Sequence, residues 1–273
     1  MLADLHTHSS ASDGQLTPHE LLQQAADADI EILAITDHDT VAGVDTLTAT
    51  KEIKTRLIPG VELSANWSNV CIHVLGLAID TRAAELRSGL QRQQSIRTER
   101  AGQIAAKLER AGFHGVCNNV RPQPGSEYIG RPDFARYLVD SGQLKDARTA
   151  FKKYLGRGKM GDVRHSWPAL EETVTWIKAA GGIAALAHPA KYKLSNLRLE
   201  ELCKQFVQCG GRALEVVSGA QDPNLTDRLA GLARRHNLYA SCGSDFHAPG
   251  QPWAELGRVQ PLPAGCRPIW ELW

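Results

Sequence analysis

Short apolar segments that end in histidine or carboxylate side chains recur along this chain of 273 residues, and they constrain its fold more than any other feature. Runs of this length and composition are typical of buried strands. The predicted strands are residues 2–5, 32–36, 57–63, 70–77, 183–187, 213–217 and 239–242. Helical patterns around residues 41–53, 168–180, 194–208 and 224–236 separate several of them. The alternation predicts βα units around a mainly parallel sheet, and hence one large α/β barrel domain.

Capping residues mark the ends of several predicted helices. Thr17 can cap a first helix, Pro18 suits its first position, and Glu20 completes a capping box. Glycine pairs at 181–182 and 210–211 follow two later helical patterns and are typical helix stops. These signals predict where the helices that connect the strands begin and end.

Residues 83–166 break the alternation, because no convincing strand pattern occurs there. A long helical pattern at 83–111 leads into a loop rich in glycine and proline, and shorter helical patterns cover 133–139 and 146–155. We therefore expect a helical insertion between the fourth and fifth strands. The predicted division is a barrel of residues 1–82 and 167–273 and an insertion of residues 83–166 that serves as a substrate lid.

The overall composition gives no sign of a membrane or a long nucleic acid as partner. The formal net charge is +1, so affinity for anions must come from a local site. None of the six cysteines forms a C-x-x-C pair, and reduced thiols are expected in a chain of this length. The first residues do not resemble a signal peptide, and no segment approaches the roughly 20 apolar residues that span a bilayer. These features predict a cytoplasmic protein and carry no prediction of its oligomeric state.

Metal-binding side chains lie at the ends of nearly all the predicted strands. Because the carboxyl ends of barrel strands open on one face, residues far apart in the sequence would converge there. Side chains alternate along a strand, so His6 and His8 point to the same side. The candidate donors are His6, His8, Asp13, His38, Glu62, His73, His188, Asp245 and His247.

This donor set indicates a cluster of divalent metals. Imidazole together with carboxylate suits zinc, manganese or iron better than calcium, which prefers oxygen ligands alone. The set exceeds the roughly four protein ligands of one tetrahedral site, so we predict two or three metals with Glu62 bridging a pair. Taken alone, His73 or His188 would more often be a structural histidine, and it is the recurrence at successive strand ends that favours a site. Surface or structural roles are expected for the remaining histidines, His19, His114, His165 and His236.

Taken in order, these motifs resemble those of the PHP (polymerase and histidinol phosphatase) family. The matching stretches are Asp4-Leu5-His6-Thr7-His8-Ser9, Ser12-Asp13-Gly14, Ile35-Thr36-Asp37-His38-Asp39, Gly60-Val61-Glu62, Ala187-His188-Pro189 and Gly243-Ser244-Asp245-Phe246-His247. They run from residue 4 to residue 247 and so cover nearly the whole chain. The resemblance implies a distorted (βα)7 barrel of the PHP type, a trinuclear metal centre and a metal-dependent phosphoesterase activity.

Carried over by position, the resemblance divides the donors among three metals. The first would be held by His6, His8, Glu62 and Asp245, the second by Asp13, His38 and His247, and the third by Glu62, His73 and His188. Manganese is the expected metal, with zinc and iron as alternatives. Some members of the family have histidine where Asp13 stands, which leaves the choice of metal open.

Three of these residues are also the predicted catalytic residues. They are Asp13, His38 and His247, and either histidine could protonate the leaving oxygen of a phosphoester. Metal-binding histidines usually have a carboxylate or carbonyl behind them, and Asp37 or Asp39 is expected to fill that role.

Within the family, the insertion and its Gly130-Arg131-Pro132 motif most resemble the branch that acts on nucleoside 3′,5′-bisphosphates, converting adenosine 3′,5′-bisphosphate to AMP and phosphate. That branch also includes enzymes that trim short 5′-phosphorylated RNA from its 5′ end. A second phosphate needs its own cationic site, for which the planar guanidinium group of arginine is suited. The predicted substrate-binding residues are Arg97, Arg100, Arg131, Asp13 and His38. Arg131 is expected in a loop that folds over the active site.

Two other functions stay open. One is a histidinol-phosphate phosphatase, which would not need an insertion large enough to cover a nucleotide. The other is a non-catalytic PHP module of a DNA polymerase, which the complete donor set disfavours. A small nucleotide or a short RNA is therefore the expected partner, rather than a membrane or a long nucleic acid, whose binding draws on many cationic contacts.

Overall fold

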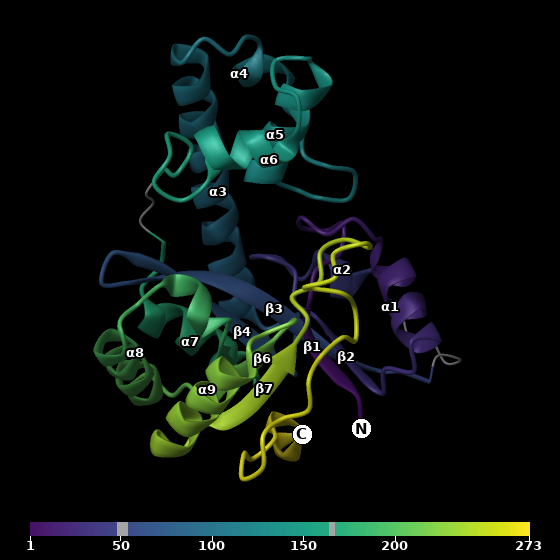
Figure 1. Cartoon of the computed structure of the whole chain (residues 1–273), viewed down its shortest axis with the longest axis vertical. Helices are drawn as coiled ribbons and strands as arrows, with labels where there is room; N and C mark the ends of the chain where they lie inside the picture. The colour runs from purple at the N-terminus through teal and green to yellow at the C-terminus, as the bar shows by residue number, and fades with distance from the viewer. Residues whose placement is uncertain (48–53, 164–166) are drawn as a thin grey trace. The chain divides into compact units, whose positions relative to one another are not determined.

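The structure, a computed structural model, describes residues 1–47, 54–163 and 167–273 (Figure 1). It divides into two compact units. The barrel unit comprises residues 1–90 and 167–273, and the insertion unit comprises residues 91–166. The boundary lies at Leu90 instead of the predicted residue 82, because Leu86 and Leu90 pack in the hydrophobic core of the barrel unit.

Seven strands form one sheet whose order follows the chain. They are β1 (Ala3–Thr7), β2 (Ile32–Ile35), β3 (Arg56–Trp67), β4 (Val70–Leu77), β5 (Ile183–Leu186), β6 (Ala213–Ser218) and β7 (Tyr239–Gly243). Each predicted strand is present, and all but β3 end within two residues of the predicted positions. The seven-stranded α/β barrel that the sequence predicts is confirmed.

The sheet is mainly parallel, as predicted, and β4 is the exception, because it runs antiparallel to both β3 and β5. β3 extends to Trp67 and forms a hairpin with β4 through Ser68 and Asn69, whose φ angles are 46° and 62°. Positive φ at both positions is typical of the tight turns that join two antiparallel strands. The reversal pairs His73 with Ser64, so His73 lies at the same end of the barrel as Glu62.

The barrel closes between β1 and β7. The His8 N–H donates to the carbonyl oxygen of Phe246 (2.9 Å), and the Asp245 N–H donates to that of His6 (2.8 Å). The strands approach so closely that a Cβ at Gly243 would lie 2.3 Å from the Cβ of His6, so only glycine fits there. Closure therefore brings the first and last histidine motifs of the chain together.

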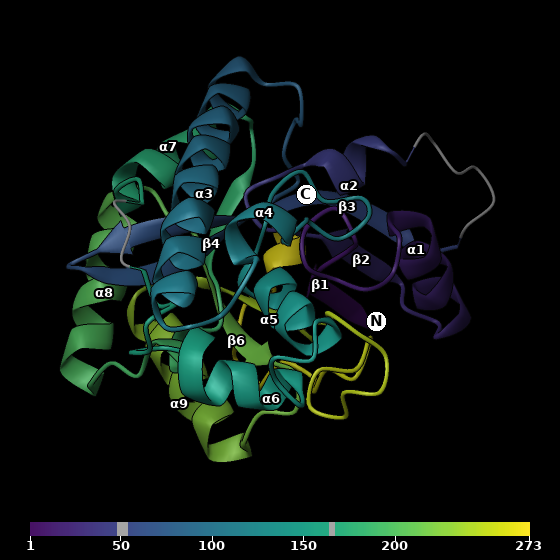
Figure 2. The same cartoon turned by 90° about the horizontal axis from the view of Figure 1, so that it is seen from above.

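Helices lie outside the strands of the barrel unit, with α7 and α8 on one side and α1 and α2 on the other in Figure 2. They are α1 (Pro18–Asp27), α2 (Ala42–Asp45), α7 (Leu170–Ala179), α8 (Asn196–Gln208) and α9 (Pro223–Arg235). Thr17 forms the predicted capping box with Glu20. The helix predicted over residues 41–53 is present only at Ala42–Asp45, and residues 48–53 lie outside the described residues.

The described part of the insertion unit is helical, as predicted, and contains no strand. Its elements are α3 (Ala84–Arg110), which begins in the barrel unit, then α4 (Val116–Asn119), α5 (Arg131–Asp140), α6 (Ala147–Ala150) and a π-helical segment, Phe151–Leu155. None of the helices among the described residues is both long enough and apolar enough to cross a membrane.

Arg131 does not lie in a loop, and that prediction is wrong. It is the first residue of α5, because the Gly130 N–H donates to Oδ2 of Asp133 (2.7 Å) and Pro132 occupies the second helical position. The Arg131 guanidinium donates to the carbonyl oxygen of Leu155 (3.3 Å). Arg131 therefore takes part in the packing of the insertion unit itself.

Candidate metal centre

The structure brings all nine candidate donors together at one end of the barrel unit. They form four overlapping groups, and within each group the possible ligand atoms lie within 4.8 Å of one another. The groups are His8, Asp13, His38 and His247; His6, Glu62 and His188; His6, His8 and Asp245; and His38, Glu62 and His73. This convergence agrees with the geometry that the strand-end pattern predicts, and the role of each residue as a ligand stays a prediction.

Glu62 occupies the centre of the cluster and is fully buried. Its carboxylate is surrounded by the imidazoles of His6, His8, His38, His73 and His188. The shortest contacts are 2.8 Å from Oε1 to Nδ1 of His73, 2.9 Å from Oε1 to Nε2 of His188 and 2.9 Å from Oε2 to Nδ1 of His38. Its two oxygens face different histidines, which suits a carboxylate that bridges two cations.

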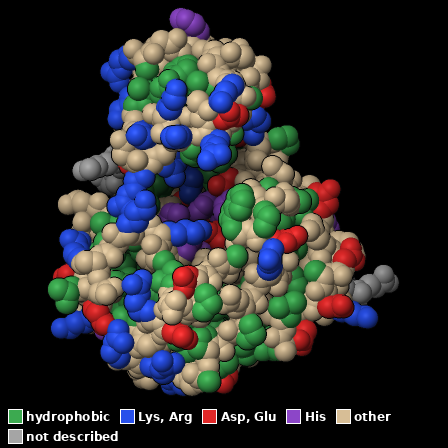
Figure 3. All heavy atoms as spheres, viewed as in Figure 1, with side chains coloured by type: hydrophobic (Ala, Val, Ile, Leu, Met, Phe, Trp, Pro, Cys, Tyr) green, Lys and Arg blue, Asp and Glu red, His purple; other side chains and the backbone are tan. Residues whose placement is uncertain are grey.

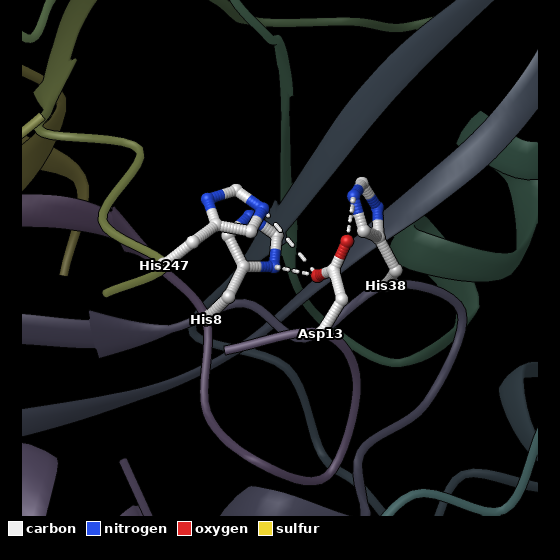
Figure 4. Close-up of side chains that lie close together, drawn as sticks. All are labelled: His8, Asp13, His38 and His247. Atoms are coloured by element: carbon white, nitrogen blue, oxygen red, sulfur yellow. Dashed lines mark ion pairs between the residues drawn. The ribbon is translucent and has the colours of Figure 1, made fainter. Parts of the chain in front are cut away.

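Asp13 organises a second, more exposed group at the edge of the cluster (Figure 4). Oδ1 of Asp13 lies 3.4 Å from Nε2 of His247 and 3.9 Å from Nδ1 of His8, and Oδ2 lies 4.0 Å from Nε2 of His38. His38 and His247 are 15% and 29% exposed, whereas His8 is fully buried. Histidine side chains gather in one place on the face shown in Figure 3, with acidic side chains beside them.

Several buried donor atoms of the cluster make no hydrogen bond within the described residues. They include Nε2 of His6 and both ring nitrogens of His8. A buried polar atom without a partner costs free energy, and native proteins rarely leave one unpaired. Lone pairs of imidazole and carboxylate that face one another across a few ångströms fit divalent cations, which would satisfy them.

The acidic groups of the cluster are held ionised by its histidines. Burial alone would raise the pKa of Glu62, but the surrounding imidazoles hold it well below its usual range. Burial lowers the pKa of His73, yet the Glu62 carboxylate outweighs this effect and raises the pKa to about 10. Burial also opposes a charge on His247, and Asp13 raises its pKa to about 9. The cluster therefore attracts positive charge, whether protons or metal ions.

Two donors have backbone conformations that side chains rarely adopt. The φ angles of His188 and Asp245 are 24° and 56°. Such left-handed conformations are unfavourable for residues other than glycine and concentrate at functional sites. These positions follow β5 and β7 directly, so the turns at the strand ends direct both side chains into the cluster.

The carboxylate that supports His6 is Glu215 of β6, a residue that the sequence prediction missed. Oε1 of Glu215 lies 3.0 Å from Nδ1 of His6, and its Oε2 accepts from the His188 N–H. The predicted supports, Asp37 and Asp39, instead accept bonds from serine side chains, namely Ser9 Oγ to Asp37 (2.6 Å) and Ser64 Oγ to Asp39 (2.9 Å). The sequence did carry one sign of this role, because Glu215 is the single acidic residue in the apolar run of residues 213–217.

Two further residues near the cluster were also missed. Lys191 contacts Oδ2 of Asp245 through its ammonium group. The Tyr192 hydroxyl donates to the carbonyl oxygen of Ala187 (2.6 Å) and accepts from the His73 N–H (2.9 Å). Both lie in a short 3₁₀ helix, Pro189–Tyr192, that follows His188.

The predicted substrate-binding arginines belong to the insertion unit. Arg97 is mostly buried, and its guanidinium lies 4.3 Å from the ring centroid of Tyr128. Arg131 bonds to Leu155 within the same unit. Their part in binding substrate, and that of Arg100, stays a prediction. Among the other histidines, His236 contacts Glu200 (2.6 Å), and His165 lies outside the described residues.

The sequence matches known proteins over its whole length. Residues 4–156 match the family model of the PHP domain. A relative from Chromobacterium violaceum, named 3′,5′-nucleoside bisphosphate phosphatase, is 44% identical over 98% of this chain and 94% of its own length. A relative from Escherichia coli K12, named 5′-3′ exoribonuclease Rnm, is 43% identical over 100% of this chain and 94% of its own length.

Solved structures support the same grouping. An amidohydrolase from Chromobacterium violaceum superposes with a TM-score of 0.88 at 42% identity, covering 100% of this chain and 95% of that one. A proposed metal-dependent phosphoesterase from Bifidobacterium adolescentis has a TM-score of 0.78 at 27% identity, covering 99% of this chain and 93% of that one. Both similarities extend over the barrel and insertion units, because nearly the whole chain is covered.

Proposed function

This chain belongs to the PHP domain family, and on that premise we propose that it hydrolyses the 3′-phosphate of nucleoside 3′,5′-bisphosphates. Adenosine 3′,5′-bisphosphate would yield AMP and phosphate. The observation that carries the proposal is the cluster of nine donors around the buried Glu62 carboxylate. The substrate follows from the 44% identity to a relative with that activity in its name, over nearly the full length of both chains.

The nine donors are the residues that would hold two or three divalent metals. His6, His8, Glu62 and Asp245 would hold one ion, Asp13, His38 and His247 another, and Glu62, His73 and His188 a third. Divalent metals lower the pKa of water and offset the charge on phosphoryl oxygens. We propose manganese, with zinc or iron as alternatives, because mixed imidazole and carboxylate ligands suit all three.

The exposure of the donors separates two roles within the cluster. His6, His8 and Glu62 are fully buried, so they can hold a cation but cannot reach a substrate. Asp13, His38 and His247 are partly exposed, which allows these side chains to contact the reacting phosphoester. The proposed catalytic role of His38 and His247 is to hold a proton for the leaving 3′-oxygen, and that of Asp13 is to orient both imidazoles.

Two supporting contacts fix the orientation of the rings. Glu215 accepts from Nδ1 of His6 (3.0 Å), which would leave Nε2 of His6 to face the cation site. Nδ1 of His247 donates to the carbonyl oxygen of Asp245 (2.9 Å), which leaves Nε2 directed at Asp13. Each ring thus presents one defined nitrogen to the centre.

A second activity, trimming of short 5′-phosphorylated RNA from its 5′ end, is favoured by the 43% identity to a relative named 5′-3′ exoribonuclease. The two activities share a substrate feature, because a 5′-phosphorylated RNA and a 3′,5′-bisphosphate both carry a phosphate on each side of a terminal ribose. We also propose a cytoplasmic location, which the six free cysteines support, since oxidising compartments favour disulfides.

Phosphate release from adenosine 3′,5′-bisphosphate by manganese-loaded protein tests the proposed function. The expected product is the 5′-monophosphate, identified by chromatography against the 3′-monophosphate. Histidinol phosphate and a short 5′-phosphorylated RNA are assayed in parallel with the same protein. Turnover of histidinol phosphate alone would contradict the nucleotide assignment and leave the phosphoesterase assignment standing.

A further inference from the structure

Lys191 places a positive charge at the edge of the metal centre. Its ammonium contacts Oδ2 of Asp245, and 58% of its side chain is exposed. The residue lies three positions after His188, in the 3₁₀ helix Pro189–Tyr192. A cationic side chain that reaches both solvent and a donor carboxylate can meet an anion that approaches the centre.

The backbone of Lys191 is hydrogen-bonded within the 3₁₀ helix. Its N–H donates to the carbonyl oxygen of His188 (2.9 Å). The next residue, Tyr192, is buried, donates to the carbonyl oxygen of Ala187 and accepts from the His73 N–H. These bonds connect the segment that carries Lys191 to two of the candidate metal ligands, His188 and His73.

The two oxygens of Asp245 face different partners. Oδ1 lies 3.4 Å from Nε2 of His6 and 3.3 Å from Nε2 of His8, which is the side where a cation would bind. Oδ2 contacts the ammonium of Lys191. A cation at Oδ1 is therefore compatible with the lysine at Oδ2, and the ammonium would lie one carboxylate group away from that cation.

We propose that Lys191 is a further catalytic residue, whose ammonium binds the oxygens of the reacting phosphoryl group at the metal centre. An ammonium is a compact charge with three donors, and the charge of a transferring phosphoryl group is spread over its oxygens. The inference rests on the proposed phosphoesterase function. It makes a distinct claim, because Lys191 would act on every phosphoester alike, with or without a second phosphate.

The alternative is that Lys191 only neutralises Asp245. In that case its removal would change how the protein holds metal and would leave the affinity for phosphate unaltered. The two possibilities therefore differ in which ligand is affected, the anion or the cation.

The test compares Lys191→Ala and Lys191→Arg with Lys193→Ala as a matched control. Lys193 is exposed, lies two residues further along the chain and, unlike Lys191, forms no ion pair with a candidate donor among the described residues. Inorganic phosphate is titrated calorimetrically into each manganese-loaded protein, and bound manganese is counted by mass spectrometry. Thermal unfolding of each variant confirms that it is folded before the binding data are compared.

For Lys191→Ala we expect the dissociation constant for phosphate to rise at least about tenfold, because one charged donor is lost. We expect kcat/KM to fall by about 10² to 10³, the usual cost of losing one preorganised donor to transition-state charge. The loss should be the same for adenosine 3′,5′-bisphosphate and for p-nitrophenyl phosphate, with unchanged manganese content. Lys191→Arg should retain most of the phosphate affinity, and Lys193→Ala should match the wild type.

Unchanged phosphate affinity in Lys191→Ala, or a loss of manganese from it, would overturn the inference. A failure of the proposed function looks different. If the wild-type protein hydrolyses no nucleotide while its phosphate binding still depends on Lys191, the assigned substrate is wrong and the role of the lysine stands.

Discussion

The barrel unit and the insertion unit bury different kinds of side chain. At the strand ends of the barrel, His6, Glu62 and Glu215 are fully buried, whereas the core of the insertion unit is built from apolar residues such as Leu108 and Phe134. Taking an ionised group out of water costs several kcal/mol unless its partners compensate. Apolar packing thus explains the interior of the insertion unit, whereas the polar end of the barrel needs compensation of the kind that the proposed metal ions would supply.

Two charged groups that the insertion unit buries, Asp133 and Arg97, have partners within it. Asp133 accepts from the Gly130 N–H and pairs with Arg136 (2.7 Å), and Arg97 stacks on Tyr128. In the barrel cluster, by contrast, both nitrogens of His8 make no hydrogen bond within the described residues. The comparison teaches that a cluster of unsatisfied buried groups, rather than buried groups as such, distinguishes a binding centre from a structural core.

The largest effect is expected for Glu62→Gln, which keeps the size of the side chain and removes its charge. Because five histidines surround this carboxylate, we expect loss of bound manganese and a fall in turnover of about a thousandfold or more. Metal analysis and phosphate release measure the two effects. Glu201→Gln, on the exposed surface of α8, is the control. Near-normal turnover in Glu62→Gln would contradict the claim that the buried polar cluster of the barrel unit binds metal.

Leu108→Ala tests the claim that apolar packing stabilises the insertion unit. Leu108 is fully buried in the core of the insertion unit, and truncation should cost about 2–5 kcal/mol of unfolding free energy. Urea denaturation measures the loss, and Leu197→Ala, at a position 84% exposed, should cost less than about 0.5 kcal/mol. Manganese content should not change, because none of the nine donors lies in the insertion unit. Loss of manganese from Leu108→Ala would contradict the assignment of metal binding to the barrel unit alone.

Glu215→Gln should have a smaller effect than Glu62→Gln, because Glu215 supports His6 without facing the cation site. Loss of the charged partner at Nδ1 of His6 should weaken manganese binding by about 10- to 100-fold. A titration of metal-free protein with manganese provides the dissociation constant. A manganese affinity equal to that of the wild type would contradict the role of the Glu215 charge in supporting His6 as a metal ligand.

The smallest effect is expected for Arg131→Ala in the insertion unit. If Arg131 binds the second phosphate, KM for adenosine 3′,5′-bisphosphate should rise about tenfold, the loss of roughly one charged hydrogen bond. Hydrolysis of p-nitrophenyl phosphate should be unaffected, in contrast to the equal losses expected for Lys191→Ala. Lys145→Ala, at an exposed position of the same unit, is the control. Equal losses on both substrates would argue against a separate phosphate site in the insertion.

The sequence was sufficient to predict what depends on local pattern. Apolar runs located all seven strands, and Thr17 with Glu20 located the start of α1. The convergence of His6 and Asp245, which are far apart in the chain, followed from the rule that barrel strands open on one face. Closure of β1 against β7 produces this convergence directly.

Features that depend on pairing between distant residues were missed. An apolar run has no direction, so β4 could not be distinguished from a parallel strand. Glu215 and Lys191 lack the histidine motifs that mark the other donors, and only the folded chain places them against His6 and Asp245. Arg131 was assigned to a loop, whereas Gly130 and Asp133 cap a helix that begins with it.

The central claim is that the nine donors hold a cluster of divalent metals. Crystals of manganese-loaded protein, recorded at the manganese absorption edge, test it most directly, because anomalous scattering locates each ion without reference to activity. We predict two or three anomalous peaks among these donors, with Glu62 contacting at least two of the ions. A single peak, or peaks only outside the cluster in fully loaded protein, would contradict the account.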